Sequence, residues 1–594
     1  MPIPPVGPEP IRGNVPLAAG YLKLLARQRG LEADYDIEIV PAAEANLLGD
    51  RGLVASVLAR EPWLVGFTCY LWNIDRSLWI AEQMKAARPE VQILLGGPEI
   101  TADNAWVLEH PALDYAAIGE GEQTFCELLT ALRSSPTPQQ PIDGLFVSAA
   151  AGGEAGRLPN FRRPLPQLNE ISSPYLAGIL DAADEQMLLL ETIRGCVFKC
   201  KFCYYPKSYD SLYFLSEEKI VANLEHARRR GAKEVVLLDP TLNQKRDFNA
   251  FLRLLARENA ERQFTFFGEL RAEGITAETA RLLREANFTE VEIGLQSLDP
   301  AAQELMDRKN NMKAFERGVR AMLDAGLEVK VDLIIGLPGD TAASIRRGLD
   351  YLCTSRLYSS IQVFNLAILP GTAFRQEAES LGLKHQPRPP YYVLGTPTLQ
   401  LEQFYELMQE AQERLGIEYD PLPQPKLEFD ERSPGARCVR VDLDHPSTAP
   451  FPPDDTLSQA LTLWLRSSDF HRDRQAAAQA IERILAANPF TTLQVVLEPA
   501  GDLAALSLDC LDACARACFR RPTYLDRFYA VQPGRPKGAK RLVVLAPWQA
   551  RSRAPLQWID DIADYGTLVW RGTVSPSEDL DAHEYVLPLS GSHA

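Results

Sequence analysis

The sequence predicts an α/β protein of several domains, and two regular alternations of apolar strands with helices support that prediction. One alternation runs from Leu17 to about Leu129, and a second with larger repeats runs from Met187 to Ile368. Alternation of this kind is typical of parallel sheets covered by helices. The chain has 594 residues, which is enough for about three or four domains.

The first expected domain spans residues 1–133. Its expected helices lie at 17–28, at 76–87 and from 121 onward, and its expected strands lie at 35–40, 63–68, 91–95 and 115–118. The loops 69–73, 96–99 and 119–122 follow three of these strands, at the sheet edge where parallel α/β proteins bind ligands, and the last two contain glycines that let a ligand approach the backbone. Only three residues precede the proline-rich stretch 4–10, so the sheet is expected either to lack an edge strand or to belong to a chain with a truncated start.

A linker with a hairpin of 144–148 and 158–162 is expected over residues 134–184. The second domain, 185–385, has expected strands at 188–192, 234–239, 264–269, 290–295, 329–335 and 361–368. The third, 386–594, is expected to be α/β or α+β and to close the mouth of the second. Its expected helices lie at 401–415, 457–466 and 472–487, and its strands at 493–497 and 541–545.

Three cysteines follow the first strand of the second domain. Cys196, Cys200 and Cys203 have the spacing Cys-x3-Cys-x2-Cys, which offers three thiolates to a four-iron cluster and leaves one iron open to a ligand. Structural cysteines, or a zinc site that lacks its fourth ligand, are the alternatives. Zinc sites usually add a second cysteine or histidine pair, and none follows this motif.

The cysteine motif, with Phe202 before its last cysteine, resembles the signature of radical S-adenosylmethionine (SAM) enzymes. The six strand-helix repeats match the partial (β/α)6 barrel of that family, whose active site opens at the carboxyl ends of the strands. The resemblance implies a [4Fe-4S] cluster on Cys196, Cys200 and Cys203. It also implies that SAM binds the open iron and is cleaved by one electron to methionine and a 5′-deoxyadenosyl radical.

Candidate SAM contacts lie at the ends of the other strands. A carboxylate or amide could accept hydrogen bonds from the SAM ammonium, and an arginine fork suits its carboxylate. A plain turn near Asp239, or an exposed salt bridge at Glu269 and Arg271, remains the alternative. The full set of candidates is Phe202, Asp239, Thr241, Asn243, Glu269, Arg271, Gln296, Ile335 and Leu337.

The loops of the first domain resemble the cobalamin-binding domain found before the barrel in B12-dependent radical SAM proteins. An ordinary Rossmann-like domain is the alternative. The Asp-x-His-x2-Gly motif of mutases is absent, so no histidine of this domain is expected on cobalt, and Tyr70 or Trp72 could lie against that face or in the core. The candidate contacts are Asn14, Leu17, Cys69, Tyr70, Trp72, Gly96, Gly97, Glu99, Gly119, Glu120, Gly121 and Glu122.

Cys510, Cys514 and Cys518 in the third domain have a spacing of four residues, which places them along one stripe of a helix. A straight stripe cannot converge on one cluster, so packing in the core is expected. A second cluster is the alternative.

Composition excludes several classes of function. The chain has 62 Lys and Arg against 79 Asp and Glu, for a net charge of −17, which disfavours nucleic acid as a partner. No apolar run reaches the length of a membrane span, and ten cysteines without an apolar leader favour the cytoplasm over a secreted disulfide framework.

Together these features predict a cobalamin-dependent radical SAM enzyme that methylates an unactivated carbon of a small-molecule or peptide substrate. Electrons are expected from a flavodoxin- or ferredoxin-type donor. A non-methylating enzyme that cyclises, contracts or rearranges its substrate is one alternative, and a cobalamin-binding sensor or scaffold is another.

Overall fold

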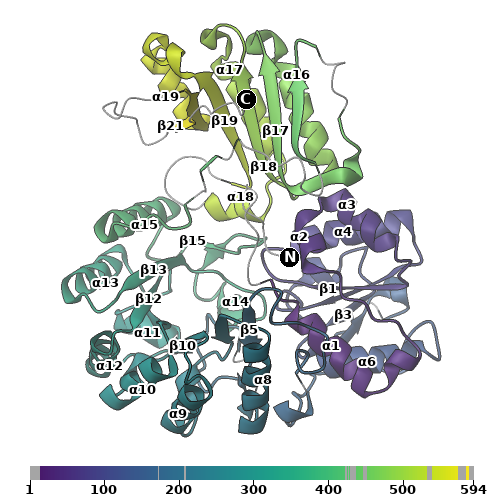
Figure 1. Ribbon diagram of the computed structural model, residues 1–594, viewed down its shortest axis with the longest axis vertical. Coiled ribbons are helices and arrows are strands. Elements are labelled where there is room, and N and C mark those ends of the chain that lie inside the picture. Colours follow the sequence, from purple (N-terminus) through teal and green to yellow (C-terminus); the bar gives the residue numbers. More distant parts are fainter. Residues whose placement is uncertain are drawn as a thin grey trace.

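The computed structural model describes residues 14–587, apart from 155, 172, 206–208, 210, 422–423, 426, 428–435, 446–450, 531–537 and 573–583. The described chain forms three bodies, shown in Figure 1 as a purple N-terminal domain, a teal middle domain and a green to yellow C-terminal domain. The proline-rich stretch 4–10 and the missing edge strand expected before it lie outside these residues. Among the described residues, no helix is both long enough and apolar enough to cross a membrane.

The N-terminal domain is an α/β sandwich built on a small parallel sheet. Strands β1 (Leu64–Thr68), β2 (Gln92–Gly96) and β3 (Tyr115–Ala117) pair in this order. Helices α3 (Asp50–Leu58) and α4 (Ile74–Ala87) pack on one face, and α1 (Leu17–Gln28) and α6 (Gly121–Leu132) pack on the other. These strands and the helices α1, α4 and α6 confirm the predicted elements.

Two predictions for this part of the chain are wrong. Residues 35–40 form no strand; Lys23 Nζ donates to the Ile37 carbonyl oxygen, and the segment lies along a cavity described below. The expected hairpin is absent, because β4 (Leu145–Val147) pairs antiparallel with β3 instead of with 158–162. The first sheet therefore extends into the predicted linker.

The middle domain has the six predicted parallel repeats, in two adjoining sheets. Strands β5 (Met187–Leu190), β8 (Glu234–Leu237) and β9 (Thr265–Phe267) form one sheet. The other holds β10 (Glu269–Leu270), β11 (Glu290–Gln296), β12 (Glu328–Ile335) and β13 (Ser360–Asn365). No closed barrel forms among the described strands, in agreement with a partial barrel.

Helices between these strands begin where a short polar side chain caps the free backbone N–H groups of the first turn. The helices are α8 (Glu217–Arg229), α9 (Phe248–Glu258), α10 (Ala277–Ala286), α12 (Met312–Asp324) and α13 (Ala342–Ser355). The side chains that cap them are Ser216, Asp247, Thr276, Asn311 and Thr341. Because the strands of each sheet pair in parallel, the loops at their carboxyl ends lie along one rim of that sheet.

The C-terminal domain is a six-stranded parallel sheet whose strands follow chain order, from β16 (Ala436–Asp442) to β21 (Glu584–Leu587). Helices α16 (Phe470–Ala487), α17 (Leu508–Phe519) and α19 (Leu556–Tyr565) pack on one face. The helix predicted at 457–466 is wrong: the segment is strand β17 (Leu457–Ser467). Leu461, Leu463 and Leu465 alternate into the core, which is the two-residue period of a strand.

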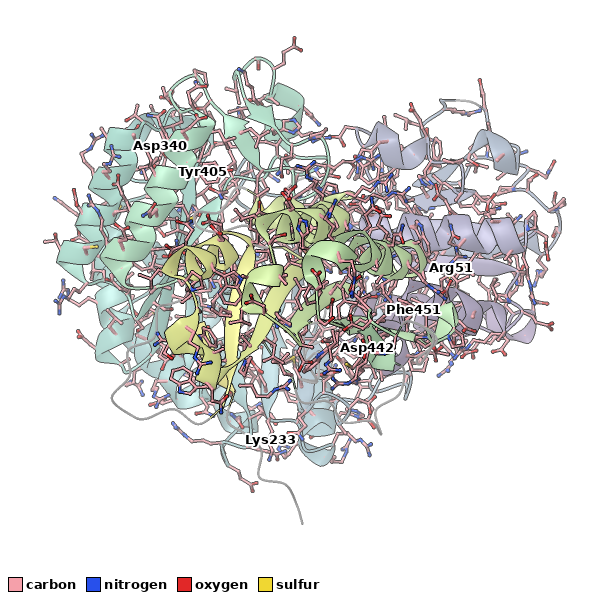
Figure 2. All side chains as sticks on the ribbon, turned by 90° about the horizontal axis from the view of Figure 1, so that it is seen from above. Arg51, Lys233, Asp340, Tyr405, Asp442 and Phe451 are labelled. Carbon is pink, nitrogen blue, oxygen red and sulfur yellow. The ribbon has the colours of Figure 1, made fainter. Side chains whose placement is uncertain are left out.

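This domain contacts both of the others, and it lies over them when the molecule is viewed from above (Figure 2). Asp50 of α3 accepts a hydrogen bond from the Phe490 backbone N–H at 2.8 Å. A Cβ at Gly52 would lie 2.6 Å from the Asp455 carbonyl oxygen, so glycine permits this close approach. On the other side, Gln386 Nε2 donates to the Arg527 carbonyl oxygen of α18 (Tyr524–Tyr529).

Candidate functional site

Three cavities lie in or beside the middle domain, and residues of the N-terminal and middle domains together line two of them. The thiol cavity, of about 160 Å³, is lined by Cys196, Cys200 and Cys203. The glycine cavity, of about 630 Å³, is lined by the ends of the strands in the N-terminal sheet. A third, the adjoining cavity, has about 550 Å³ and shares several of those residues. Among the described residues, none beyond Asp332 lines any of the three, so the described part of the C-terminal domain contributes no lining residue to them.

The loop that carries the three thiols is held in place from two sides. Gly195 has a φ of +93°, and a Cβ there would lie 2.3 Å from the Ser211 carbonyl oxygen. Gln244 accepts a hydrogen bond from Val197 N–H and donates one to the Gly195 carbonyl oxygen, both at 3.1 Å. Glycine at 195 is therefore required by both conformation and space.

The three thiols surround the cavity. Within the described chain, no three Cys, His, Asp or Glu side chains meet closely enough to hold a single metal ion. A four-iron cube takes one thiolate per iron, so its ligands need to enclose a space instead of meeting at a point. Burial raises the pKa of the Cys203 thiol to about 11, and a bound cluster would supply the positive charge that favours the thiolate.

Part of the cavity wall is acidic. Glu269, Glu292 and Asp332 line it. Burial and the neighbouring Glu292 raise the pKa of Glu269 to about 7. The same two causes raise the pKa of Asp332 to about 8. Asp332 Oδ1 and Gln296 Oε1 are buried without a hydrogen-bond partner, and such acceptors suit the ammonium and ribose hydroxyls of SAM.

Five of the nine predicted SAM contacts line the thiol cavity: Phe202, Thr241, Glu269, Arg271 and Gln296. Arg271 is paired with Glu273 at 2.8 Å and lies 4.2 Å from the centre of the Phe198 ring.

The other four do not line it. Asp239 Oδ1 accepts the Thr192 and Ile193 backbone N–H groups at 2.7 and 2.8 Å, which fixes the turn before the cysteine loop. Asn243 makes two hydrogen bonds to the Arg271 backbone. Ile335 and Leu337 are core residues, 2% and 0% exposed.

Glu292, Asp332 and Arg308 line the cavity but were not predicted. Along β11, Val291, Ile293 and Leu295 are buried in the core, whereas Glu292, Gly294 and Gln296 point the other way. This alternation places a carboxylate inside the barrel, and it could have been found in the sequence. Arg308 lies in a loop, where its NH1 comes 3.9 Å from Cys200 Sγ, and no sequence pattern indicates that contact.

The glycine cavity has walls without side chains where a large ligand would need room. Gly66, Gly96, Gly97, Gly119 and Gly121 all line it. A Cβ at Gly66 or Gly119 would meet no atom within 4 Å, so a side chain there would enter the cavity itself. The size and the flat, glycine-rich wall fit a corrin ring, and no histidine of the described chain lines this cavity.

Most predicted cobalamin contacts lie on these cavities. Tyr70, Gly96, Gly97, Gly119, Glu120, Gly121 and Glu122 line the glycine cavity, and Asn14 and Leu17 line the adjoining cavity.

Three predicted contacts do not line either cavity. Cys69 is fully buried in the core. Trp72 stacks on Tyr70 with ring centres 4.6 Å apart. Glu99 accepts a hydrogen bond from Tyr391 Oη at 2.6 Å, at the contact with the end of the middle domain.

Tyr205 lines all three cavities. It follows the last cysteine of the thiol loop and is 39% exposed. Its neighbour Tyr204 lines the glycine cavity. Ligands bound in the two main cavities would therefore lie on either side of a single tyrosine.

Cys510, Cys514 and Cys518 lie on helix α17, as predicted. Their exposed fractions are 0%, 0% and 1%, and they belong to the core between the helices and the C-terminal sheet. This burial agrees with packing in the core.

Comparison with known proteins matches a family model to each of the two domains that line these cavities. Residues 190–352 match the Radical SAM superfamily, and residues 14–129 match the B12 binding domain. The chain is 28% identical to the cobalamin-dependent radical SAM methyltransferase TokK of Streptomyces tokunonensis, over 66% of this chain and 60% of that protein. It is 25% identical to 2-(S-pantetheinyl)-carbapenam-3-carboxylate methyltransferase of Streptantibioticus cattleyicolor, over 64% and 58%.

The chain thus spans about 60% of the length of these curated relatives. Its fold is similar to that of the radical SAM methyltransferase TsrM of Kitasatospora setae, with a TM-score of 0.53 and 16% identity over 68% of this chain and 87% of that one. The similarity confirms the predicted arrangement of an α/β domain beside a partial barrel.

Proposed function

We propose that this chain, which matches both the Radical SAM superfamily and the B12 binding domain, is a cobalamin-dependent radical SAM methyltransferase acting on an unactivated carbon. The observation that carries the proposal is the shared wall of the two main cavities. Three thiols surround one cavity, glycines open the other, and Tyr205 borders both. A substrate at that wall can reach ligands in both cavities.

The residues present fit the groups that the two domains would hold. Cys196, Cys200 and Cys203 would hold a [4Fe-4S] cluster, and the acidic wall with Gln296 and Arg271 would hold SAM. The glycine cavity would hold cobalamin. When bound, these groups supply a 5′-deoxyadenosyl radical for hydrogen abstraction and a methyl group for transfer.

The protein's own side chains position the ligands and keep water away from them. Glu269 and Asp332 keep part of their carboxyl groups protonated near neutral pH, since burial raises the pKa of each to about 7 and about 8. Each can then either donate or accept a hydrogen bond to a polar ligand. The aromatic rings of Phe198, Phe202 and Tyr205 line the cavity, and a bound substrate that displaces water from these apolar walls would protect a reactive radical.

A small molecule or a peptide is the proposed substrate class, and a flavodoxin- or ferredoxin-type protein is the proposed electron donor. All ten cysteines are free thiols. Free thiols in this number support a reducing compartment such as the cytoplasm.

The test is product stoichiometry with anaerobically reconstituted protein, hydroxocobalamin, SAM and a reductant. Because one SAM supplies the methyl and another the radical, each methyl transferred is expected to yield one S-adenosylhomocysteine and one 5′-deoxyadenosine. Formation of 5′-deoxyadenosine without S-adenosylhomocysteine would exclude methyl transfer and favour a rearranging enzyme.

A further inference from the structure

Arg194 joins the two cofactor-binding domains through a buried ion cluster. Its Nε, NH1 and NH2 atoms each pair with a different carboxylate: Glu191 at 2.8 Å, Glu120 at 2.9 Å and Glu122 at 2.7 Å. The Arg194 side chain is only 7% exposed. Glu191 belongs to the middle domain, whereas Glu120 and Glu122 belong to the N-terminal domain, so one guanidinium spans the boundary.

Both ends of this cluster lie at a proposed ligand site. Glu120 and Glu122 flank Gly121 at the start of α6, and all three line the glycine cavity. At the other end, Arg194 is two residues before Cys196, and the carbonyl oxygen of the intervening Gly195 accepts a hydrogen bond from Gln244 Nε2 at 3.1 Å. A shift of the Gly119–Glu122 turn is therefore passed to the thiol loop through few and rigid links.

Attraction between the Arg194 guanidinium and the three carboxylates keeps the two domains joined at this point. One guanidinium faces three carboxylates in a buried place, so removal of the arginine would leave three uncompensated acids. Glu120 is also tied down by its second oxygen, which accepts the Leu165 backbone N–H at 2.7 Å. Arg194 thus cannot follow one domain without moving the carboxylates of the other.

The alternative is that the Arg194 ion cluster only stabilises the fold. The chain has another buried ion pair for comparison. Arg76 and Asp50 form a buried pair at 2.6 Å, but neither residue lines any of the three cavities. Arg194, in contrast, lines both the glycine cavity and the adjoining cavity.

We propose that Arg194 is a positioning residue that couples cobalamin binding in the glycine cavity to SAM binding at the thiol cavity. This inference rests on the proposed function, since it requires both ligands. A ligand that orders the Gly119–Glu122 turn orders Arg194 and with it the loop of Cys196, so each ligand increases the affinity for the other. Coupling is reciprocal, and a factor of about 5 or more is expected.

The experiment measures equilibrium binding of SAM to cluster-reconstituted full-length protein, with and without saturating hydroxocobalamin, and binding of hydroxocobalamin with and without SAM. The variants are Arg194→Met and Arg194→Lys, and Arg76→Met is the matched control. We expect the coupling factor to fall to about 1 in Arg194→Met and to remain in Arg76→Met. Lysine keeps the charge but not the three-pronged geometry, so Arg194→Lys should retain only part of the factor.

The outcomes separate the two proposals. If the wild-type protein binds neither ligand, the proposed function is wrong. If it binds both ligands with independent affinities, or if Arg194→Met keeps the full coupling factor, only the role of Arg194 is overturned. Should Arg194→Met fail to fold, Glu122→Gln provides the same test, because it keeps an acceptor but removes one charge, and an unchanged factor there would also refute the inference.

Discussion

Gly66 gives the sharpest test of the glycine cavity. It lies in the middle of β1 (Leu64–Thr68), is exposed, and lines both the glycine and adjoining cavities. A Cβ there meets no atom within 4 Å. We therefore expect Gly66→Ala, Gly66→Val and Gly66→Leu to fold normally, with the free energy of unfolding of the ligand-free protein changed by less than about 1 kcal/mol.

Binding of cobalamin should weaken in step with the size of the side chain. Leucine places about four non-hydrogen atoms where ligand atoms would lie, and at about 0.3 kcal/mol per displaced atom this costs about 1 kcal/mol of contact. Forced rearrangement of the cavity adds about 1–3 kcal/mol. The sum of about 2–4 kcal/mol corresponds to a roughly 30- to 1000-fold higher Kd for Gly66→Leu.

Equilibrium dialysis with hydroxocobalamin, read by corrin absorbance, measures this Kd. Thermal unfolding of each ligand-free variant is the control for folding. Gly348→Ala is a control for the substitution, because a Cβ at Gly348 also meets no atom within 4 Å and this residue lines none of the three cavities described above. If Gly66→Leu folds and binds cobalamin as tightly as the wild type does, the corrin does not occupy this cavity.

Three further predictions concern the remainder of the chain. Glu99→Gln should stabilise the protein at pH 8 by about 3 kcal/mol. Burial raises the pKa of Glu99 from 4.5 to about 7, so the wild-type protein loses stability as the pH rises between those two values, whereas the glutamine variant does not. Urea unfolding at several pH values measures this difference, and equal pH slopes of the two proteins would contradict it. Asp239→Ala should lower the free energy of unfolding by about 2 kcal/mol or more, because it leaves two buried N–H groups unpaired. A loss of SAM affinity without a loss of stability would contradict this and would show that Asp239 contacts SAM. Cys514→Ala should cost about 1–2 kcal/mol by calorimetry with no change in iron content, and a halved iron content would point to a second cluster.

Local patterns in the sequence predicted the loops that line the cavities. They failed for segments whose secondary structure depends on tertiary packing. The cysteine spacing and the glycines after β2 and β3 identified the thiol loop and the glycine cavity directly. Residues 35–40 have the alternation of a strand, but no neighbouring strand pairs with them, and they lie along the glycine cavity instead. Strand β17 was predicted as a helix, although its alternating leucines carry the period of a strand.

The candidate contacts failed for a similar reason. A polar residue at the end of a strand can face the ligand or brace the loop, and the sequence does not distinguish these roles. Asp239 and Glu99 both stabilise loops: Asp239 accepts backbone N–H groups, and Glu99 accepts the hydroxyl of Tyr391. Glu120 and Glu122 line the glycine cavity but also form ion pairs with Arg194, which lies 74 and 72 residues further along the chain and which no local pattern could predict.

The cluster on Cys196, Cys200 and Cys203 is the central claim, and iron content with SAM cleavage measures it most directly. Anaerobically reconstituted wild-type protein should hold about four irons per chain and form 5′-deoxyadenosine from SAM when reduced, and Cys438→Ala, a control in the C-terminal sheet, should do the same. Cys200→Ala should lose both properties while it keeps its thermal unfolding transition. Cleavage of SAM by folded Cys200→Ala at the wild-type rate, or wild-type protein that holds no iron, would contradict the account.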